Sequence, residues 1–230
     1  MNIQFPAMIM MRRSARRVVA LWLLAAALGL SLFPLVGVQA TDPTLSGGAL
    51  AVALQRGGYV ILFRHAMTDQ SQQDTDLQNI TNCQTQRNLT GEGQTQARTI
   101  GEAFTTLGIP VGQVVSSDLC RALDTARLAT GKAPEPTERI RDNTPGKVAE
   151  ATMAERNAAL RQILTSPQPA GTNRVVVSHM PNILSVTGVQ LNEGDALVLA
   201  PDGSGDVRLV ARLSVADWNT LAHIVARLGP

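Results

Sequence analysis

Aromatic residues and lysine are scarce in this sequence. Its 230 residues include four Phe, two Trp, one Tyr and two Lys. The formal net charge is +2, from 20 Lys and Arg against 18 Asp and Glu, and it becomes −2 when the four arginines of residues 1–40 are left out. A nucleic-acid-binding domain is expected to carry a basic surface. The composition therefore argues against a nucleic-acid partner.

Low-complexity tracts and internal repeats are also missing after Thr41. Hydrophobic residues make up 44% of the chain and charged residues 17%, and glycine and proline are spread along it. This composition excludes intrinsic disorder and collagen-like or coiled-coil repeats. We expect one globular domain over residues 41–230.

The N-terminus has the pattern of an export signal. Four arginines at residues 12–17 precede an uncharged run over residues 18–38, and Val38-Gln39-Ala40 offers the small residues that a signal peptidase recognises. The sequence predicts a signal peptide over residues 1–40, a mature chain that begins at Thr41, and a periplasmic or secreted protein. The alternative is an uncleaved N-terminal helix that anchors the protein to the membrane.

The chain has only two cysteines, Cys83 and Cys120. An oxidising compartment would let them pair if the fold brings them together, and the alternative is two buried, inert thiols. Neither fits a thiolate phosphatase. That chemistry needs an arginine six positions after the cysteine, where this chain has Leu89 and Ala126.

Short apolar runs alternate with helical periodicities, which is typical of an α/β fold. We expect a three-layer α/β/α sandwich with a mostly parallel central sheet and an antiparallel C-terminal hairpin. A polar loop is expected over residues 68–88, and Ser116, Ser117 and Asp118 are expected to cap the helix that follows them. Ser214 with Asp217 resembles a capping box. The strands are expected at 59–63, 114–115, 174–177, 196–199 and 207–213, and the helices at 46–55, 91–107, 121–129, 152–164 and from 214 onward.

Polar residues follow three of these strands: Arg64 and His65, then Ser117 to Arg121, then Ser178 and His179. Ligands bind at the carboxyl ends of parallel strands, so these side chains are expected to meet. Arginine forks suit phosphate oxygens, and a histidine beside them can attack phosphorus. The third histidine, His223, lies within the last helix and is expected to be an ordinary helix histidine.

Four blocks of the sequence resemble the histidine phosphatase superfamily, which has the phosphoglycerate mutase-like fold. The blocks are Leu62–Ala66, Asn88–Thr90 with Gly93, Gln96 and Ala97, Ser116–Ala122 with Thr125 and Ala126, and Val176–His179. The resemblance implies that His65 is the phosphorylated nucleophile. It also implies that Arg64, Arg121 and His179 hold the phosphoryl oxygens.

The chain departs from the family pattern at three positions. Ala66 replaces the glycine after the nucleophile, Ser71 stands where many members have asparagine, and Met180 stands where one branch has its proton-donating aspartate. The donor must therefore lie elsewhere. The candidates are Glu193, Asp69, Asp118 and Glu150. Glu193 is favoured because it precedes a strand that we expect to be antiparallel, so that it starts at the catalytic edge.

The sequence thus predicts an exported phosphomonoester phosphatase that works through a phosphohistidine. Two alternatives stay open: a non-catalytic phosphoryl-binding protein of the same fold, and a phosphoglycerate mutase-like phosphotransferase. Three scattered histidines give no metal site and no cofactor is expected. The expected partner is a phosphorylated small molecule or an envelope sugar phosphate, and the expected state is a monomer.

Overall fold

A computed structural model describes residues 44–142, 144 and 146–228 of the chain. The predicted signal peptide lies outside the described residues. No described helix is both long enough and apolar enough to span a bilayer. The elements, in chain order, are α1 (Gly47–Arg56), β1 (Val60–Arg64), the 3₁₀ turn η1 (Cys83–Thr85), α2 (Gly91–Leu107), β2 (Val111–Ser117), α3 (Cys120–Thr130), β3 (Glu135–Thr137), the 3₁₀ turn η2 (Glu138–Ile140), α4 (Glu150–Thr165), β4 (Asn173–Ser178), α5 (Met180–Thr187), β5 (Ala196–Pro201), β6 (Val207–Leu213) and α6 (Val215–Leu228).

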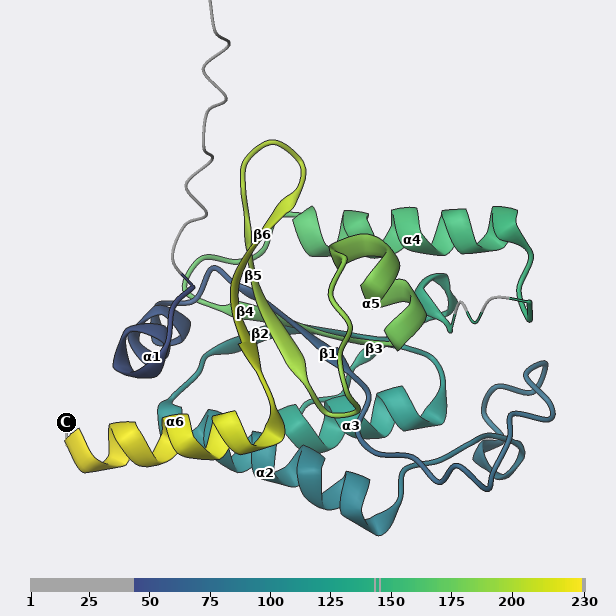
Figure 1. The fold of residues 1–230 in the computed structure, drawn as a ribbon, viewed down its shortest axis with the longest axis horizontal. Coiled ribbons are helices and arrows are strands. Elements are labelled where there is room, and N and C mark those ends of the chain that lie inside the picture. The colour runs from purple at the N-terminus through teal and green to yellow at the C-terminus, as the bar shows by residue number, and fades with distance from the viewer. Residues whose placement is uncertain (1–43, 143, 145, 229–230) are drawn as a thin grey trace, which may run out of the picture. The chain divides into compact units, whose positions relative to one another are not determined.

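The six strands form one sheet in the order β3-β2-β4-β1-β5-β6 (Figure 1). The pairs β2–β3, β2–β4 and β1–β4 are parallel, whereas β1–β5 and β5–β6 are antiparallel. The predicted mostly parallel sheet with an antiparallel C-terminal hairpin is confirmed. Because β1 lies between β4 and β5, the start of β5 lies at the edge where β1 and β4 end.

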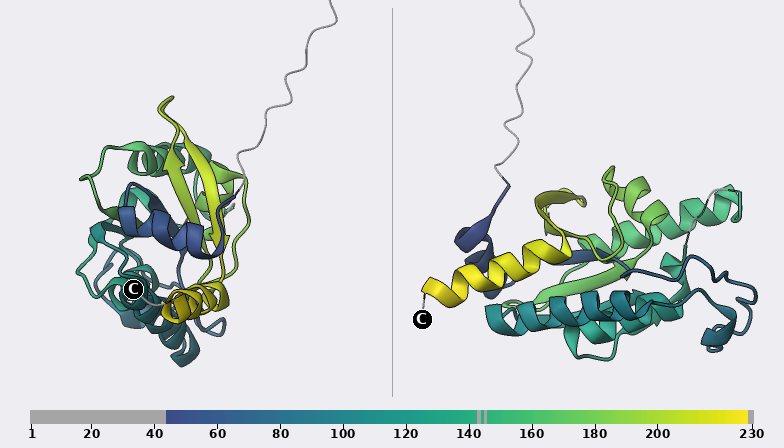
Figure 2. Two further views of the ribbon diagram at one scale, coloured as in Figure 1. Left: turned by 90° about the vertical axis from the view of Figure 1, so that its left-hand side faces the viewer. Right: turned by 60° about the horizontal axis from the view of Figure 1, so that its bottom comes forward.

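Helices cover both faces of the sheet (Figure 2). Along β1, Ile61 and Phe63 face the core shared with α1, α2, α3 and α6, while Val60 and Leu62 face the core shared with α4 and α5. This alternation is the side-chain period of a strand that is buried on both sides. The predicted three-layer α/β/α sandwich is confirmed.

The N-terminus of α2 packs against the segment that follows β1. Thr90 caps it, since its side chain accepts a hydrogen bond from the Gly93 backbone N–H. A Cβ at Gly93 would collide with the Met67 carbonyl, so only glycine lets α2 approach this closely. The capping box at α6 is also confirmed, because Ser214 N donates to Asp217 and Asp217 N donates to Ser214 Oγ.

Two elements were not expected from the sequence. β3 is a three-residue edge strand, Glu-Pro-Thr, too short and too polar to show a strand pattern. α5 starts directly after His179 and is only eight residues long, with a proline in its first turn. Both therefore carry too little periodicity to be recognised.

The expected cap of α3 is wrong. Leu119 is the N-cap residue and no side chain of residues 116–118 caps the helix. Ser117 Oγ lies 2.8 Å from a ring nitrogen of His179, and Asp118 is bound by Arg141. The N–H of Cys120 instead donates to the side-chain oxygen of Gln86, a buried residue of the long loop. The loop thus supplies the acceptor that the strand end does not.

Candidate active site

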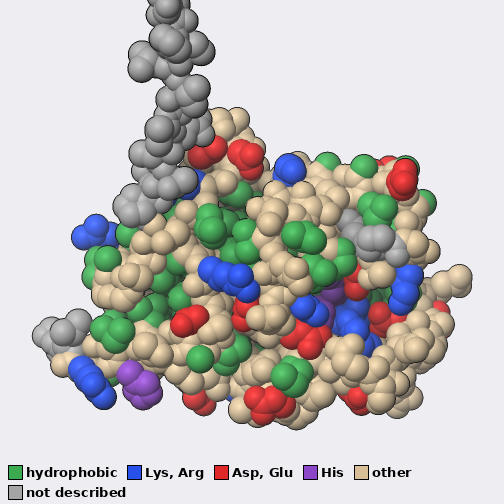
Figure 3. Space-filling model, viewed as in Figure 1, with side chains coloured by type: hydrophobic (Ala, Val, Ile, Leu, Met, Phe, Trp, Pro, Cys, Tyr) green, Lys and Arg blue, Asp and Glu red, His purple; other side chains and the backbone are tan. Residues whose placement is uncertain are grey.

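The carboxyl ends of β2, β4 and β1 lie side by side in the sheet. Arg64 pairs with Ser178 in register, so the residues after each strand, His65 and His179, are neighbours. Their ring centroids are 5.3 Å apart. Arg121 joins them from the first turn of α3, which follows β2. In Figure 3, basic, acidic and histidine side chains gather in one recess of the surface on this face.

The ring of His65 is held in one tautomer. It is 2% exposed, and its Nδ1 lies 2.9 Å from the Ala66 carbonyl oxygen. A carbonyl can only accept, so Nδ1 carries the proton and Nε2 carries the lone pair. Burial, His179 and Arg121 lower the pKa of His65 well below 6.5, and the ring is neutral at pH 7. A neutral Nε2 is a competent nucleophile.

His179 is fully buried beside it. Its Nε2 lies 2.8 Å from Ser117 Oγ, and its Nδ1 has no hydrogen-bond partner among the described residues. Burial and the neighbouring Arg121 and Arg87 lower the pKa of His179 well below 6.5. A bound anion would reverse this effect and favour the protonated ring.

Arg121 is buried completely, which is rare for an arginine without full pairing. Its Nη1 lies 3.0 Å from Asp74 Oδ1, and its Nη2 lies 3.6 Å from Asp142 Oδ2. Within the described chain, Nε and Nη2 make no hydrogen bond. Neither Asp74 nor Asp142 was selected from the sequence, because their pairing with Arg121 spans 47 and 21 positions and leaves no local pattern.

Arg64 is the last residue of β1 and directly precedes His65. Its Nη1 donates to the Leu191 carbonyl at 2.9 Å, and its Nη2 lies 3.4 Å from Glu193 Oε1. Burial lowers its pKa, and the charge of Glu193 opposes this. The Nε of Arg64 has no partner among the described atoms.

Arg87 is a further site residue that the sequence analysis missed. Its Nη1 donates to Gln70, its backbone carbonyl accepts from Arg121, and its Nε is buried without a described partner. Its charge also lowers the pKa of His179. Its position directly before Asn88, the first residue of the second family block, was the signal that could have found it.

Unpaired donors are concentrated at this site. Of the seven buried side-chain polar atoms without a partner in the described structure, five belong to its residues. They are Arg64 Nε, Arg87 Nε, Arg121 Nε, Arg121 Nη2 and His179 Nδ1. Buried donors left without acceptors are costly and rare in folded proteins. Four of the five are arginine nitrogens, which donate hydrogen bonds to oxyanions, so these residues are suited to an anion-binding site.

Glu193 reaches the site as the antiparallel pairing of β5 predicts. It accepts a hydrogen bond of 2.7 Å from Thr68 Oγ1, and its Oε1 lies 4.0 Å from His65 Nδ1. It therefore lies beside the nitrogen of His65 that already donates to Ala66.

The other three donor candidates are bound to other residues or exposed. Asp69 accepts two hydrogen bonds from Ser71, which lower its pKa, and Asp118 accepts two from Arg141. Glu150 is exposed at the start of α4. His223 is an exposed residue of α6. Among the described residues, no hydrogen bond or ion pair joins these three carboxylates or His223 to Arg64, Arg87, Arg121 or His179.

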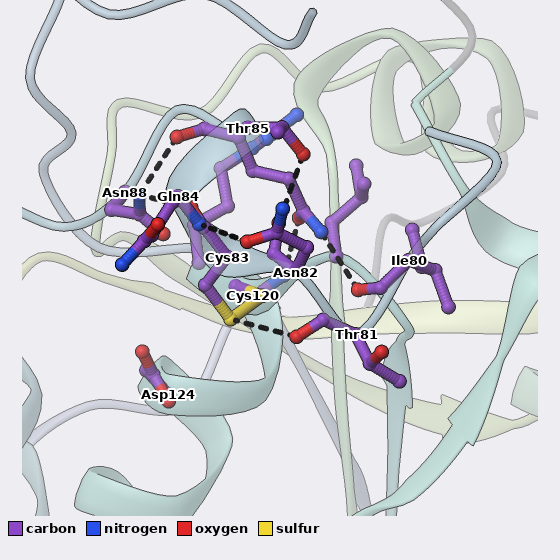
Figure 4. The surroundings of a disulfide bond; sticks show 12 residues. Ile80, Thr81, Asn82, Cys83, Gln84, Thr85, Asn88, Cys120 and Asp124 are labelled. Carbon is purple, nitrogen blue, oxygen red and sulfur yellow. Dashed lines mark hydrogen bonds between the residues drawn. A yellow bond between two sulfur atoms is a disulfide. The ribbon is translucent and has the colours of Figure 1, made fainter. Parts of the chain in front are cut away.

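A disulfide bond joins Cys83 to Cys120 across a Cα–Cα distance of 5.8 Å, so the pairing alternative is confirmed. Figure 4 shows it between η1 in the long loop and the first residue of α3. Cys120 immediately precedes Arg121, and Cys83 lies four residues before Arg87. The bond therefore ties together two segments that supply site arginines. Within the described residues, no group of three or more His, Cys, Asp or Glu side chains could hold a metal ion.

Known proteins resemble the chain over the part that builds this site. The family model of the histidine phosphatase superfamily (branch 1) matches residues 60–181. No curated protein sequence matches the chain.

Several solved structures share the fold. One is a phosphoserine phosphatase mutant from Entamoeba histolytica in complex with phosphoserine (20% identity, 69% of this chain and 98% of that chain, TM-score 0.51). Another is the phosphoserine phosphatase from the same organism in complex with 3-phosphoglyceric acid (19% identity, 70% of this chain and 98% of that chain, TM-score 0.51). The protein histidine phosphatase SixA complexed with tungstate is also similar to the chain (15% identity, 69% of this chain and 98% of that chain, TM-score 0.46). At these identities, the likeness to the two phosphoserine phosphatase structures establishes the fold alone.

Proposed function

The chain belongs to the histidine phosphatase superfamily, and on that basis we propose that it hydrolyses phosphomonoesters through a phosphohistidine intermediate on His65. The observation that carries this proposal is a set of five buried nitrogens without a hydrogen-bond partner, on Arg64, Arg87, Arg121 and His179, at the same site as the neutral His65. Phosphoryl transfer depends mainly on positioning and on stabilising charge on the oxygens that do not react. Arg64, Arg121 and His179 hold those oxygens, and Arg87 adds a further donor.

In the first step, Nε2 of His65 attacks phosphorus and the bond from phosphorus to the leaving oxygen breaks. The Nδ1 proton, held on the Ala66 carbonyl, keeps the ring in the reactive tautomer. Positive charge that develops on the ring is stabilised by Glu193, 4.0 Å from Nδ1. The leaving oxygen takes a proton from an acid, and the alcohol departs.

We propose Asp142 as that acid. The sequence favours Glu193, but Glu193 lies beside Nδ1, accepts from Thr68 and pairs with Arg64. These contacts suit a positioning residue. Asp142 likewise accepts hydrogen bonds from Thr144 and contacts Arg121. Its side chain is more exposed than that of Glu193, at 24% against 14%, so a leaving group and water can reach it more easily.

In the second step, water attacks the phosphohistidine and the bond from phosphorus to Nε2 breaks. The carboxylate of Asp142, which lost its proton in the first step, accepts one from the water. Inorganic phosphate leaves and both groups return to their starting states. The cycle needs no cofactor and balances in protons and phosphate.

The substrate we propose is a phosphorylated small molecule. The solved phosphoserine phosphatase of the same fold is described with phosphoserine and with 3-phosphoglyceric acid, which are both small phosphomonoesters. The export signal expected at residues 1–40 would place this chain with envelope compounds, so a sugar phosphate of the cell envelope is the proposed class.

Phosphate release from 4-nitrophenyl phosphate, without added metal, tests the function. We expect turnover by residues 41–230, and a loss of about 10⁴-fold or more in His65→Ala, because the nucleophile is gone. The variant should still be protected against heat by inorganic phosphate, since its arginines remain.

Two outcomes would favour the alternatives. A wild-type protein that releases no phosphate but is protected by it would be a phosphoryl-binding protein. A protein that isomerises phosphoglycerate instead of releasing phosphate from it would be a transferase.

A further inference from the structure

A cavity of about 460 Å³ borders the proposed phosphoryl site. Two of its lining residues, Asp74 and Asp142, are the carboxylates that contact Arg121. The cavity therefore begins where the phosphoryl site ends. It extends toward α4, from which Arg156 lines it, and toward the segment before α4, from which Lys147 lines it.

Most charges of this cavity are already matched. Arg141 donates two hydrogen bonds to Asp118, of 2.7 and 2.6 Å, and this pairing raises the pKa of Arg141. The carboxylate of Asp74 lies 3.0 Å from Nη1 of the buried Arg121, and that of Asp142 lies 3.6 Å from Nη2. Arg141 and Asp74 are therefore already engaged in ion pairs within the protein.

Two cationic side chains that line the cavity, Arg156 and Lys147, have no carboxylate partner among the described residues. Arg156 is half-buried, and its Nη1 donates to the backbone carbonyl of Asp142 at 2.8 Å. Lys147 is exposed. In the part of the chain that the structure describes, neither forms an ion pair with a carboxylate. Arg156 also contributes to the field that lowers the pKa of His179, which places it within electrostatic reach of the phosphoryl site.

We propose that Lys147 and Arg156 bind a second anionic group of the substrate, a carboxylate or a phosphate. Asp142 links the two parts, because its side chain faces Arg121 and its carbonyl is held by Arg156. A substrate whose phosphoryl group lies on Arg121 would extend past Asp142 into the cavity. This inference rests on the proposed function and narrows its substrate class to phosphomonoesters with two anionic groups.

Matched substrates test it. Glycerol 3-phosphate and 3-phosphoglycerate share a three-carbon skeleton and differ in a carboxylate. Glucose 6-phosphate and glucose 1,6-bisphosphate differ in a second phosphate, so the two pairs separate the two kinds of anion. We expect kcat/KM for phosphate release to favour the compound with two anionic groups by about tenfold in at least one pair, mainly through KM.

The variants are Lys147→Gln and Arg156→Gln, with Arg161→Gln as the matched control. Arg161 is an exposed residue of α4, the helix that carries Arg156, and it does not line the cavity. We expect each cavity variant to lose most of the preference and the control to keep it. Cavity variants that keep the wild-type ratio, or a control that loses it equally, would overturn the inference and leave the proposed function standing.

A binding measurement decides the case in which nothing is hydrolysed, which would count against the proposed function alone. Thermal protection by the four compounds is measured in the wild type and in Lys147→Gln, whose exposed side chain makes unfolding an improbable cause of any change. Stronger protection by compounds with two anionic groups, reduced in the variant, supports the inference. Equal protection within each pair overturns it.

Discussion

At the scale of single residues, the site combines neutral histidines with permanently charged neighbours. His65 and His179 are buried next to arginines, so protonation of either ring is disfavoured in the free protein. The arginines keep their charge and present nitrogen donors without acceptors. The same contacts that hold the rings neutral prepare the site for an anion.

The activity should therefore persist into acid. Since the pKa of His65 lies well below 6.5, the reactive neutral ring is present throughout the range above that value. We predict that kcat/KM, corrected for ionisation of the substrate, has its acid limb below pH 6.5. The pH profile with 4-nitrophenyl phosphate measures this. An enzyme pKa at or above 6.5 on that limb would contradict the prediction.

The lowered pKa values of His65 and His179 make the stability of the protein depend on pH. The unfolded chain takes up protons at both histidines as pH falls through 6.5, whereas the folded chain does so only at lower pH. The free energy of unfolding should therefore decrease as pH falls below 6.5.

The roles of the two carboxylates can be separated by the leaving group. We predict that Asp142→Asn loses about 10²-fold or more on glycerol 3-phosphate, whose alkoxide needs a proton, and far less on 4-nitrophenyl phosphate. Glu193→Gln should lose similarly on both, because a positioning role does not depend on the leaving group. Steady-state kinetics with the two substrates measures this. Equal losses in Asp142→Asn, with selective loss in Glu193→Gln, would return the acid role to Glu193.

The residues that follow strands could be found from the sequence. Arg64, His65 and His179 lie at the carboxyl ends of predicted strands. Because the carboxyl ends of parallel strands lie at the same edge of a sheet, the sequence predicts that these residues are close together. Asp142 and Asp74 could not be found in this way, because they reach Arg121 from loops whose path depends on tertiary contacts.

At the scale of elements, the long loop over residues 68–88 is part of the site. It brings Asp74 and Arg87 to Arg121, and its Gln86 supplies the acceptor for the N-terminus of α3. The disulfide between Cys83 and Cys120 joins the loop covalently to the start of α3. The polar sequence predicted the loop, and two cysteines in a chain that we expect to be exported left the bond as an open alternative.

The disulfide should matter for stability and for binding. We predict that replacing both Cys83 and Cys120 by Ser lowers the free energy of unfolding by about 2–4 kcal/mol, because the closed loop spans 37 positions. The KM should rise as Arg87 and Asp74 lose their fixed positions. Urea denaturation and steady-state kinetics measure the two effects. Unchanged KM in the folded double variant would show that the loop holds its place without the bond.

At the scale of the whole molecule, the fold places three arginines and two histidines close together at one edge of the sheet. Residues 41–230 carry a formal charge of −2, yet Arg64, Arg87 and Arg121 meet around two of the three histidines. The alternation of strands and helices predicted this architecture. It did not reveal β3 or α5, which lack periodicity and exist because neighbouring strands and helices hold them.

Export of the whole protein is a separate prediction. Expression of the full chain in a Gram-negative host should yield a mature protein that begins at Thr41, which intact mass and N-terminal sequencing would detect. Recovery of the full-length chain in the membrane fraction would instead support the anchored alternative.

The central claim is tested most directly by the phosphoenzyme itself. The protein is mixed with 4-nitrophenyl phosphate, quenched in base during turnover and digested for mass spectrometry, because phosphohistidine survives base and is lost in acid. We predict a phosphoryl group on His65 in the wild type and none at that position in His65→Ala. A phosphoryl group on another residue of the wild type, or wild-type phosphate release by His65→Ala, would contradict the mechanism.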